Sequence, residues 1–206
     1  MVSITKHLSK PYLASKYQII YFLKKFNTKV TDLGVLKDDQ VIIEKFYKNN
    51  QNNFDIIISS GGSSFSSRDY ISSFLGKNTN LLFKYVRIQP GRPVIFSKLK
   101  SNYYFSLPGN PLAVFTNLFF LISLFIDPSL KDNFSITKTY KSGFSENKRS
   151  NITKFYRVKL LKNTLHIHNS KGSAKLISLS ESDGLAIAPE GITNIKKGEK
   201  LGFIEF

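Results

Sequence analysis

The stretch from Phe54 to Asp69 constrains the fold more than any other part of the chain. It begins with the three isoleucines Ile56 to Ile58, and a short uninterrupted apolar run is typical of a strand buried on both faces of a sheet. The run ends around Gly61 and Gly62, where the backbone can approach a ligand and leave N–H groups free. Open α/β folds bind ligands at such strand ends, and free N–H groups favour an anion. An ordinary strand-to-helix loop is an equally good interpretation of this stretch alone.

Composition narrows the class of protein. The chain has 206 residues, enough for one or two domains, and its 41% apolar and 21% charged residues are typical of a soluble globular protein. The absence of cysteine excludes disulfides and thiolate metal sites. The net charge of +16 favours anionic partners. Because the lysines form no block and no nucleic-acid motif is present, compositional drift explains the charge better than a nucleic-acid partner does.

The most apolar segment, Val114–Ile126, predicts a buried helix and not a membrane span. Its length as a helix is about 20 Å, shorter than the bilayer core of about 30 Å. The polar residues Thr116, Asn117 and Ser123 also interrupt it. The amino terminus has no apolar leader, so we expect a cytoplasmic protein without a membrane partner.

The hydrophobic pattern predicts an α/β domain over residues 1–130, with a mostly parallel sheet and flanking helices. Residues 1–11 indicate no clear element. In the helix after Asp38 and Asp39, either of which suits the N-cap, we expect Val41, Ile42, Phe46 and Tyr47 to face inward. The predicted helices are Tyr12–Phe26, Asp39–Lys48, Asp69–Leu75 and Val114–Ile126. The predicted strands are Lys29–Leu33, Phe54–Ser59, Leu81–Ile88, and an antiparallel pair, Val94–Leu99 and Tyr103–Leu107.

Residues 131–206 predict a second, small β-barrel domain. Residues 131–151 are polar, which predicts a linker or a long hairpin. The remaining predicted strands are Phe155–Leu161, Thr164–His168, Leu185–Ala188 and Lys200–Phe206, with a hairpin turn at Lys162 and Asn163. His166 and His168 lie two apart, but without a third ligand a metal site there is not favoured.

Two further loops share the stiffness of the glycine turn. They are Gln89-Pro90-Gly91-Arg92-Pro93 and Leu107-Pro108-Gly109-Asn110-Pro111, and each lies next to a predicted strand. Pro111 suits the first turn of a helix, whose N–H groups and dipole provide a second anion site. No constellation for nucleophilic catalysis is present. We therefore expect the chemistry to be electrostatic positioning of an anion.

Together these loops resemble the molybdopterin molybdenumtransferases, the family that includes the carboxy-terminal part of gephyrin. The ordered set of matching segments extends from about residue 12 to the end. These segments are Asp32–Asp39, Ser59–Gly62 with Asp69-Tyr70, Gln89–Pro93, Leu107–Pro111, Gly172-Ser173, Ser182–Leu185 and Pro189–Gly191.

The resemblance implies a molybdopterin-binding α/β domain followed by a small β-barrel. It implies a metal-binding transferase of molybdenum cofactor biosynthesis, which uses Mg²⁺ to insert molybdate into adenylyl-molybdopterin and releases AMP, and a homodimer in the full-length family. Asp38 and Asp69 would then be catalytic and hold the metal, and Arg92 would be the catalytic cation. The implied substrate-binding residues are Ser59, Ser60, Gly61, Gly62, Pro90, Gly91, Pro108, Gly109, Asn110, Pro111, Arg157 and Ser173.

The chain also departs from the family pattern. Gln89 replaces a usual lysine, Ala113 a usual serine and Leu13 a usual aspartate, and the chain has about half the family's length. We expect the α/β domain to lack its first strand and the Thr-Gly-Asp-Glu loop after it. Two hypotheses follow: a transferase that needs the missing amino-terminal domains, or a catalytically inert truncated remnant or pterin-binding scaffold module.

Overall fold

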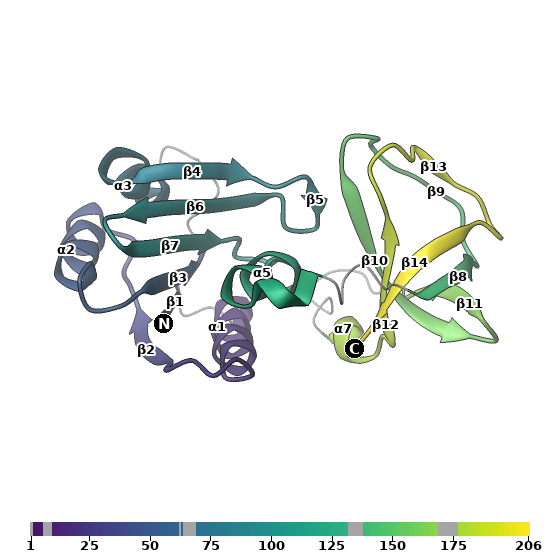
Figure 1. The fold of residues 1–206 in the computed structure, drawn as a ribbon, viewed down its shortest axis with the longest axis horizontal. Coiled ribbons are helices and arrows are strands. Elements are labelled where there is room, and N and C mark those ends of the chain that lie inside the picture. Colours follow the sequence, from purple (N-terminus) through teal and green to yellow (C-terminus); the bar gives the residue numbers. More distant parts are fainter. Residues whose placement is uncertain (1, 6–9, 62, 64–68, 132–137, 169–176) are drawn as a thin grey trace. The chain divides into compact units, whose positions relative to one another are not determined.

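The computed structural model describes residues 2–5, 10–61, 63, 69–131, 138–168 and 177–206. These residues form two compact units (Figure 1). The first comprises the described residues up to Val86 together with Gly91–Asp127, and the second comprises Arg87–Pro90 and the described residues from Pro128 onward.

The first unit is a six-stranded sheet in the order β2-β1-β3-β7-β6-β4 (Figure 1). Strands β2, β1, β3 and β7 run parallel, β6 is antiparallel to β7, and β4 is antiparallel to β6. The strands are β1 (Val2–Thr5), β2 (Thr31–Val35), β3 (Ile56–Ser60), β4 (Asn80–Tyr85), β6 (Pro93–Leu99) and β7 (Asn102–Leu107). The helices are α1 (Lys10–Leu23), α2 (Gln40–Asn50), α3 (Tyr70–Asn78), α4 (Pro111–Asn117) and α5 (Ser123–Ile126), with the π-helical turn η1 (Leu118–Ile122) between the last two.

The sheet carries a hydrophobic core on each face. Ile57 packs into the core beneath α2 and α3, and Ile58 packs into the core beneath α1 and α4. Phe96 and Phe105 stack across β6 and β7 with ring centroids 4.3 Å apart. The central strand β3 is thus buried on both sides, as its isoleucine run predicted.

Strand β1 corrects one expectation. Val2–Thr5 pairs in parallel with β2 on one side and with β3 on the other. The expectation that this domain lacks its first strand is therefore wrong, as is the absence of any element in residues 1–11. The alternating polar residues hid the strand, because a four-residue run gives too few apolar positions to be recognised.

Two further expectations change. In α2, Val41 and Ile42 were expected to face inward, but their side chains are 73% and 40% exposed, and Ile43 is buried instead. Tyr47 is buried as expected. The strand predicted over Leu81–Ile88 ends at Tyr85, and Ile88–Gln89 forms the short strand β5 of the second unit. The antiparallel pair β6 and β7 is confirmed.

The second unit is a closed five-stranded barrel. Its strands are β8 (Lys138–Ser142), β10 (Thr153–Leu161), β11 (Thr164–Ile167), β12 (Gly184–Ala188) and β14 (Lys200–Glu205). They pair in the order β11-β8-β14-β12-β10, and β10 closes the ring by pairing with β11. Strand β5 adds to β10 in parallel. The remaining elements are β9 (Glu146–Asn147), β13 (Asn194–Ile195), the 3₁₀ turn η2 (Pro128–Leu130) and α7 (Ile177–Ser180).

The barrel confirms the predicted hairpin, whose turn residues Lys162 and Asn163 both have positive φ, 48° and 60°. This geometry matches the twist of the flanking strands. Residues expected to form only a linker or hairpin supply the barrel strand β8. The interior is filled by Tyr156, Val158, Leu165, Ala186, Ala188, Ile195, Leu201 and Phe203.

Candidate anion-binding site at the sheet edge

Four loops of the first unit lie at one edge of its sheet. Since β2, β3 and β7 are parallel, the loops that follow them begin at the same edge. Strand β6 runs antiparallel to β7, so its first residue lies at this edge as well. The described residues of these loops are 36–39, 61, 63 and 69, 91–92, and 108–110. The sequence predicted that the glycine turn and the two stiff loops each lie next to a strand, and the strand directions place all three at this edge.

The glycine turn after β3 is joined to the loop after β7. Gly61 N donates to the Leu107 carbonyl at 3.0 Å, and Gly61 has the positive φ of 76°. Ser59 and Ser60 are fully buried, and Ser60 Oγ has no hydrogen-bond partner among the described residues. Of the proposed substrate-binding residues here, Gly62 lies outside the described residues. The Gly61 N–H, which was expected to be free for an anion, is therefore occupied by the Leu107 carbonyl.

Both proposed catalytic aspartates lie where a helix begins at this edge. Asp69 is the N-cap of α3, and its Oδ1 accepts a hydrogen bond from Ser72 N at 3.1 Å. Asp39 caps α2 in the same way, its Oδ1 accepting from Ile42 N at 3.0 Å. The neighbouring Asp38 therefore precedes the cap residue. Asp38 is half-buried and Asp69 is only 2% exposed.

The aspartates offer carboxylate oxygens, the ligand type that Mg²⁺ prefers, but they do not supply a complete coordination sphere. The described residues contain no group of three or more His, Cys, Asp or Glu side chains able to hold a metal. Mg²⁺ is usually bound by one or two carboxylates together with water and substrate phosphates. Asp38 and Asp69 are carboxylates of the type that such a site uses, each next to the start of a helix at this edge.

Arg92 is an exposed cation with a constrained backbone. Its carbonyl accepts from Val86 N at 3.0 Å, and its guanidinium carbon lies 5.5 Å from the centroid of the Tyr85 ring. The preceding Gly91 is buried and has a φ of 114°. A Cβ atom at Gly91 would lie 2.7 Å from Asn117 Nδ2 and 2.8 Å from Thr116 Oγ1. Only glycine fits this position.

The loop after β7 leads directly into α4. Asn110 is the N-cap, its Oδ1 accepting from Leu112 N at 3.0 Å, and Pro111 lies in the first turn. Pro108 is buried, Gly109 half-buried and Asn110 exposed. The cap and the proline confirm the predicted helix start. The N-terminal end of α4 thus lies at the edge that the other three loops share.

Sequence reasoning missed three residues that support this edge: Tyr47, Tyr85 and Asn117. Tyr47 is buried, and burial raises the pKa of its hydroxyl. A hydrogen bond with Ser59 lowers this pKa, whereas the Tyr104 and Asp69 charges raise it. The net upward shift keeps Tyr47 neutral. For Asn117 the sequence did hold a signal, because a polar residue inside an apolar helix requires a buried partner.

In the second unit, Pro90 and Arg157 are the described candidates. Arg157 is half-buried on β10 opposite Leu185, and burial lowers the pKa of its guanidinium. Ser173 lies outside the described residues. Of the two histidines, His166 is exposed, and His168 Nε2 lies 3.0 Å from Glu181 Oε2.

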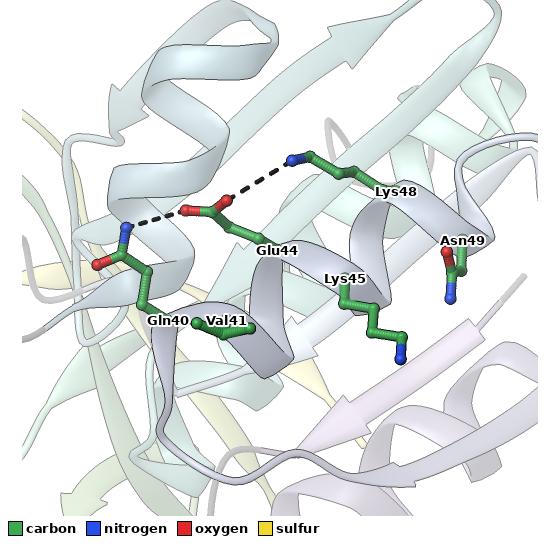
Figure 2. A pocket seen from close by; sticks show the side chains of 6 residues that line it. All are labelled: Gln40, Val41, Glu44, Lys45, Lys48 and Asn49. Carbon is green, nitrogen blue, oxygen red and sulfur yellow. Dashed lines mark hydrogen bonds and ion pairs between the residues drawn. The ribbon is translucent and has the colours of Figure 1, made fainter.

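A separate shallow groove of about 340 Å³ lies on the outer face of α2 (Figure 2). Glu44 accepts from Gln40 at 2.9 Å and pairs with Lys48 at 3.6 Å, while Lys45 points away from this group. The other lining residues are Val41 and Asn49. None of the proposed site residues lines this groove.

Comparison with known families decides the relationship. Residues 12–130 match the family described as the probable molybdopterin binding domain. Residues 140–206 match the MoeA C-terminal region, domain IV. The chain belongs to the molybdopterin molybdenumtransferase family. Members of this family take part in molybdenum cofactor biosynthesis.

Individual relatives agree with this assignment. A molybdopterin molybdenumtransferase of Haemophilus influenzae is 32% identical over 54% of this chain and 28% of its own. One from Nostoc sp. is 25% identical over 91% of this chain and 46% of its own. A putative molybdopterin biosynthesis protein of Methanocaldococcus jannaschii is 27% identical over 95% of this chain and 48% of its own length. The chain thus spans about half the length, or less, of the curated relatives it matches.

Solved structures confirm the fold. A molybdopterin biosynthesis MoeA protein from Pyrococcus horikosii aligns with a TM-score of 0.76 at 21% identity, over 99% of this chain and 53% of its own. A molybdenum cofactor biosynthesis protein from Pyrococcus furiosus aligns with a TM-score of 0.74 at 20% identity, over 100% of this chain and 67% of its own. The predicted α/β domain followed by a small β-barrel is therefore correct. Within the described residues, no helix is long and apolar enough to cross a membrane.

Proposed function

We propose that this chain takes part in the insertion of molybdate into adenylyl-molybdopterin, with release of AMP. The observation that carries the proposal is that four loops lie at the same sheet edge, and one of them carries the exposed Arg92. A guanidinium suits an oxyanion because its planar donors can contact two oxygens at once. Backbone N–H groups at helix starts add positive potential for phosphate.

The proposed roles follow the chemistry of the side chains. Arg92 would orient the molybdate oxyanion, and the family resemblance assigns Arg157 and Ser173 to oxyanion contacts. Asp38 and Asp69 would hold Mg²⁺, which would neutralise phosphate charge when bound. The substrate phosphates and pterin would contact Ser59, Ser60, Gly61, Gly62, Pro90, Gly91, Pro108, Gly109, Asn110 and Pro111.

A direct test is titration of the full chain with molybdate by calorimetry. Arg92→Ala should weaken binding by about 10- to 100-fold, the effect of losing a hydrogen bond to a charged group. Arg149→Ala is the matched control, because Arg149 is exposed in the second unit and its loss changes the net charge equally. Equal losses in the two variants, or no binding by the unaltered chain, would contradict the proposal.

A pterin-binding module without turnover is a second candidate. Gln89 is exposed and uncharged, and Ala113 has no hydroxyl at the start of α4. Incubation with adenylyl-molybdopterin, molybdate and Mg²⁺, followed by measurement of AMP, separates the candidates. Binding without AMP release would favour the module. Gain of release in Gln89→Lys with Ala113→Ser would show that these two positions limit turnover.

A further inference from the structure

We propose that Asn117 is a positioning residue for Arg92, an inference that rests on the proposed function of Arg92. Asn117 lies at the end of α4 and is fully buried. Its Nδ2 donates to the Gly91 carbonyl at 3.0 Å and to the Ala113 carbonyl at 2.8 Å. One side chain therefore joins the loop that carries Arg92 to the helix that follows β7.

The hydrogen bonds fix the backbone on both sides of Arg92. The Gly91 carbonyl belongs to the peptide group before the Arg92 Cα atom, and Asn117 holds it. The Arg92 carbonyl belongs to the next peptide group, and Val86 N holds it at 3.0 Å. Because both flanking peptide planes are held, the direction in which the Arg92 side chain leaves the backbone is set. Preorganising a charged group in this way strengthens binding without adding a contact.

The close approach of the loop supports the same role. The positive φ of Gly91, and the 2.7 Å and 2.8 Å that would separate its Cβ from Asn117 and Thr116, leave no space for a side chain. The Gly91 backbone thus lies directly against α4. The Asn117 hydrogen bond occurs inside this packed contact, shielded from water.

The acceptor end of Asn117 shows which part of the side chain matters. Oδ1 is buried and has no hydrogen-bond partner among the described residues. An unsatisfied buried acceptor is destabilising, and an apolar residue of the same size would avoid it. The donor end is therefore the functional part of this amide. The helix also changes to π spacing at Leu118, immediately after Asn117, and such turns are frequent at functional sites.

Asn117→Ser tests the inference, since a serine hydroxyl can still bond the Ala113 carbonyl but is too short to reach Gly91. Thr116 shows that a hydroxyl on this helix makes such a bond, with Oγ1 3.1 Å from the Ala113 carbonyl. Asn102→Ser is the matched control. Asn102 is also buried, and its Nδ2 donates to the Phe54 carbonyl at the opposite edge of the sheet.

Three measurements on the full chain decide the matter: urea unfolding, molybdate titration and ¹⁵N relaxation of the Gly91 and Arg92 amides without ligand. Both variants should lose stability. Only Asn117→Ser should weaken molybdate binding, by about 3- to 10-fold, and make Gly91 and Arg92 more mobile. In an Arg92→Ala background, Asn117→Ser should have no further effect on affinity. If Asn117→Ser does not fold, Asn117→Thr, which keeps more volume, takes its place.

Unchanged loop relaxation in Asn117→Ser would overturn the inference. Equal weakening of molybdate binding in Asn102→Ser would overturn it too, since general destabilisation would then suffice. Failure of the unaltered chain to bind molybdate would instead contradict the proposed function. The relaxation measurement would still test whether Asn117 holds the loop.

Discussion

The aromatic ring of Tyr85 faces the guanidinium of Arg92, with the guanidinium carbon 5.5 Å from the ring centroid. Tyr85 ends β4 and Arg92 precedes β6, and these antiparallel strands place the two residues at the same sheet edge. Tyr85 is 53% exposed, so its ring does not serve the core. Its position supports a role in holding Arg92.

We expect Tyr85→Leu to weaken molybdate binding by about two- to five-fold, because an exposed cation–π contact contributes about 0.5–1 kcal/mol. Tyr85→Phe keeps the ring and should bind within twofold of the unaltered chain. Calorimetric titration measures both. Equal weakening in the two variants would assign the effect to the hydroxyl instead of the ring.

Gly91→Ala should destabilise the first unit by about 1–3 kcal/mol, through both backbone strain and collision with Asn117 and Thr116. Gly198→Ala is the control, because Gly198 also has positive φ, 91°, but nothing lies within 4 Å of a Cβ there. Urea unfolding should show a larger loss for Gly91→Ala. Similar losses would mean that strain alone explains the effect.

Asp69 offers a way to separate a structural role from a metal-binding role. Asp69→Asn keeps an oxygen that can cap α3, so stability should change little, whereas Asp69→Ala should lose about 0.5–2 kcal/mol. If Asp69 binds Mg²⁺, both variants should lose the Mg²⁺ dependence of adenylyl-molybdopterin binding. Retention of that dependence in Asp69→Asn would assign Asp69 to capping alone. Asp39→Asn, at the corresponding cap of α2, is the control.

The ion pair between Asp32 and Lys16, 2.6 Å apart, predicts a dependence of stability on pH. Burial raises the pKa of Asp32, but hydrogen bonds from Lys16 and from Gly34 N outweigh it, so the pKa lies below its usual 3.8. A lowered carboxyl pKa stabilises the folded state above the unfolded value, and this stabilisation is lost as pH falls through the folded value.

Asp32→Asn should therefore reduce the free energy of unfolding by less than about 1 kcal/mol at neutral pH, since the pair is partly exposed. The difference from the unaltered chain should disappear below pH 3.8 as Asp32 is protonated. Urea unfolding across this range measures it. A difference that persists after protonation would show that the charge is not responsible.

Much of the first unit could be predicted because its central strand and its loops carry local signals. The isoleucine run of β3 marks burial on both faces, and Asp39, Asp69 and Asn110 mark helix starts by their capping chemistry. In α2 the prediction of the inward face was wrong for Val41 and Ile42, whose side chains are exposed. Ile43 is buried instead, because tertiary packing overrides the local pattern. Strand β1 escaped notice because its pairing with β2 and β3, not its composition, makes it a strand.

The supporting residues of the site were harder to predict than the loops. Asn117 and Gly91 are 26 positions apart, and no local pattern connects them. The interruption of an apolar helix by Thr116 and Asn117 indicated buried polar partners without naming them. The contact between Tyr85 and Arg92 depends likewise on the register between β4 and β6.

The short strand β5 has a consequence for how such a protein can be rearranged. The chain leaves the first unit after Val86, contributes Arg87–Pro90 to the barrel unit, and returns at Gly91. No single cut can therefore separate the two units, because Ile88 and Gln89 would stay behind when residues after Asp127 were removed. An exchange of modules between proteins, in evolution or by engineering, would have to carry the barrel and the segment preceding Arg92 together.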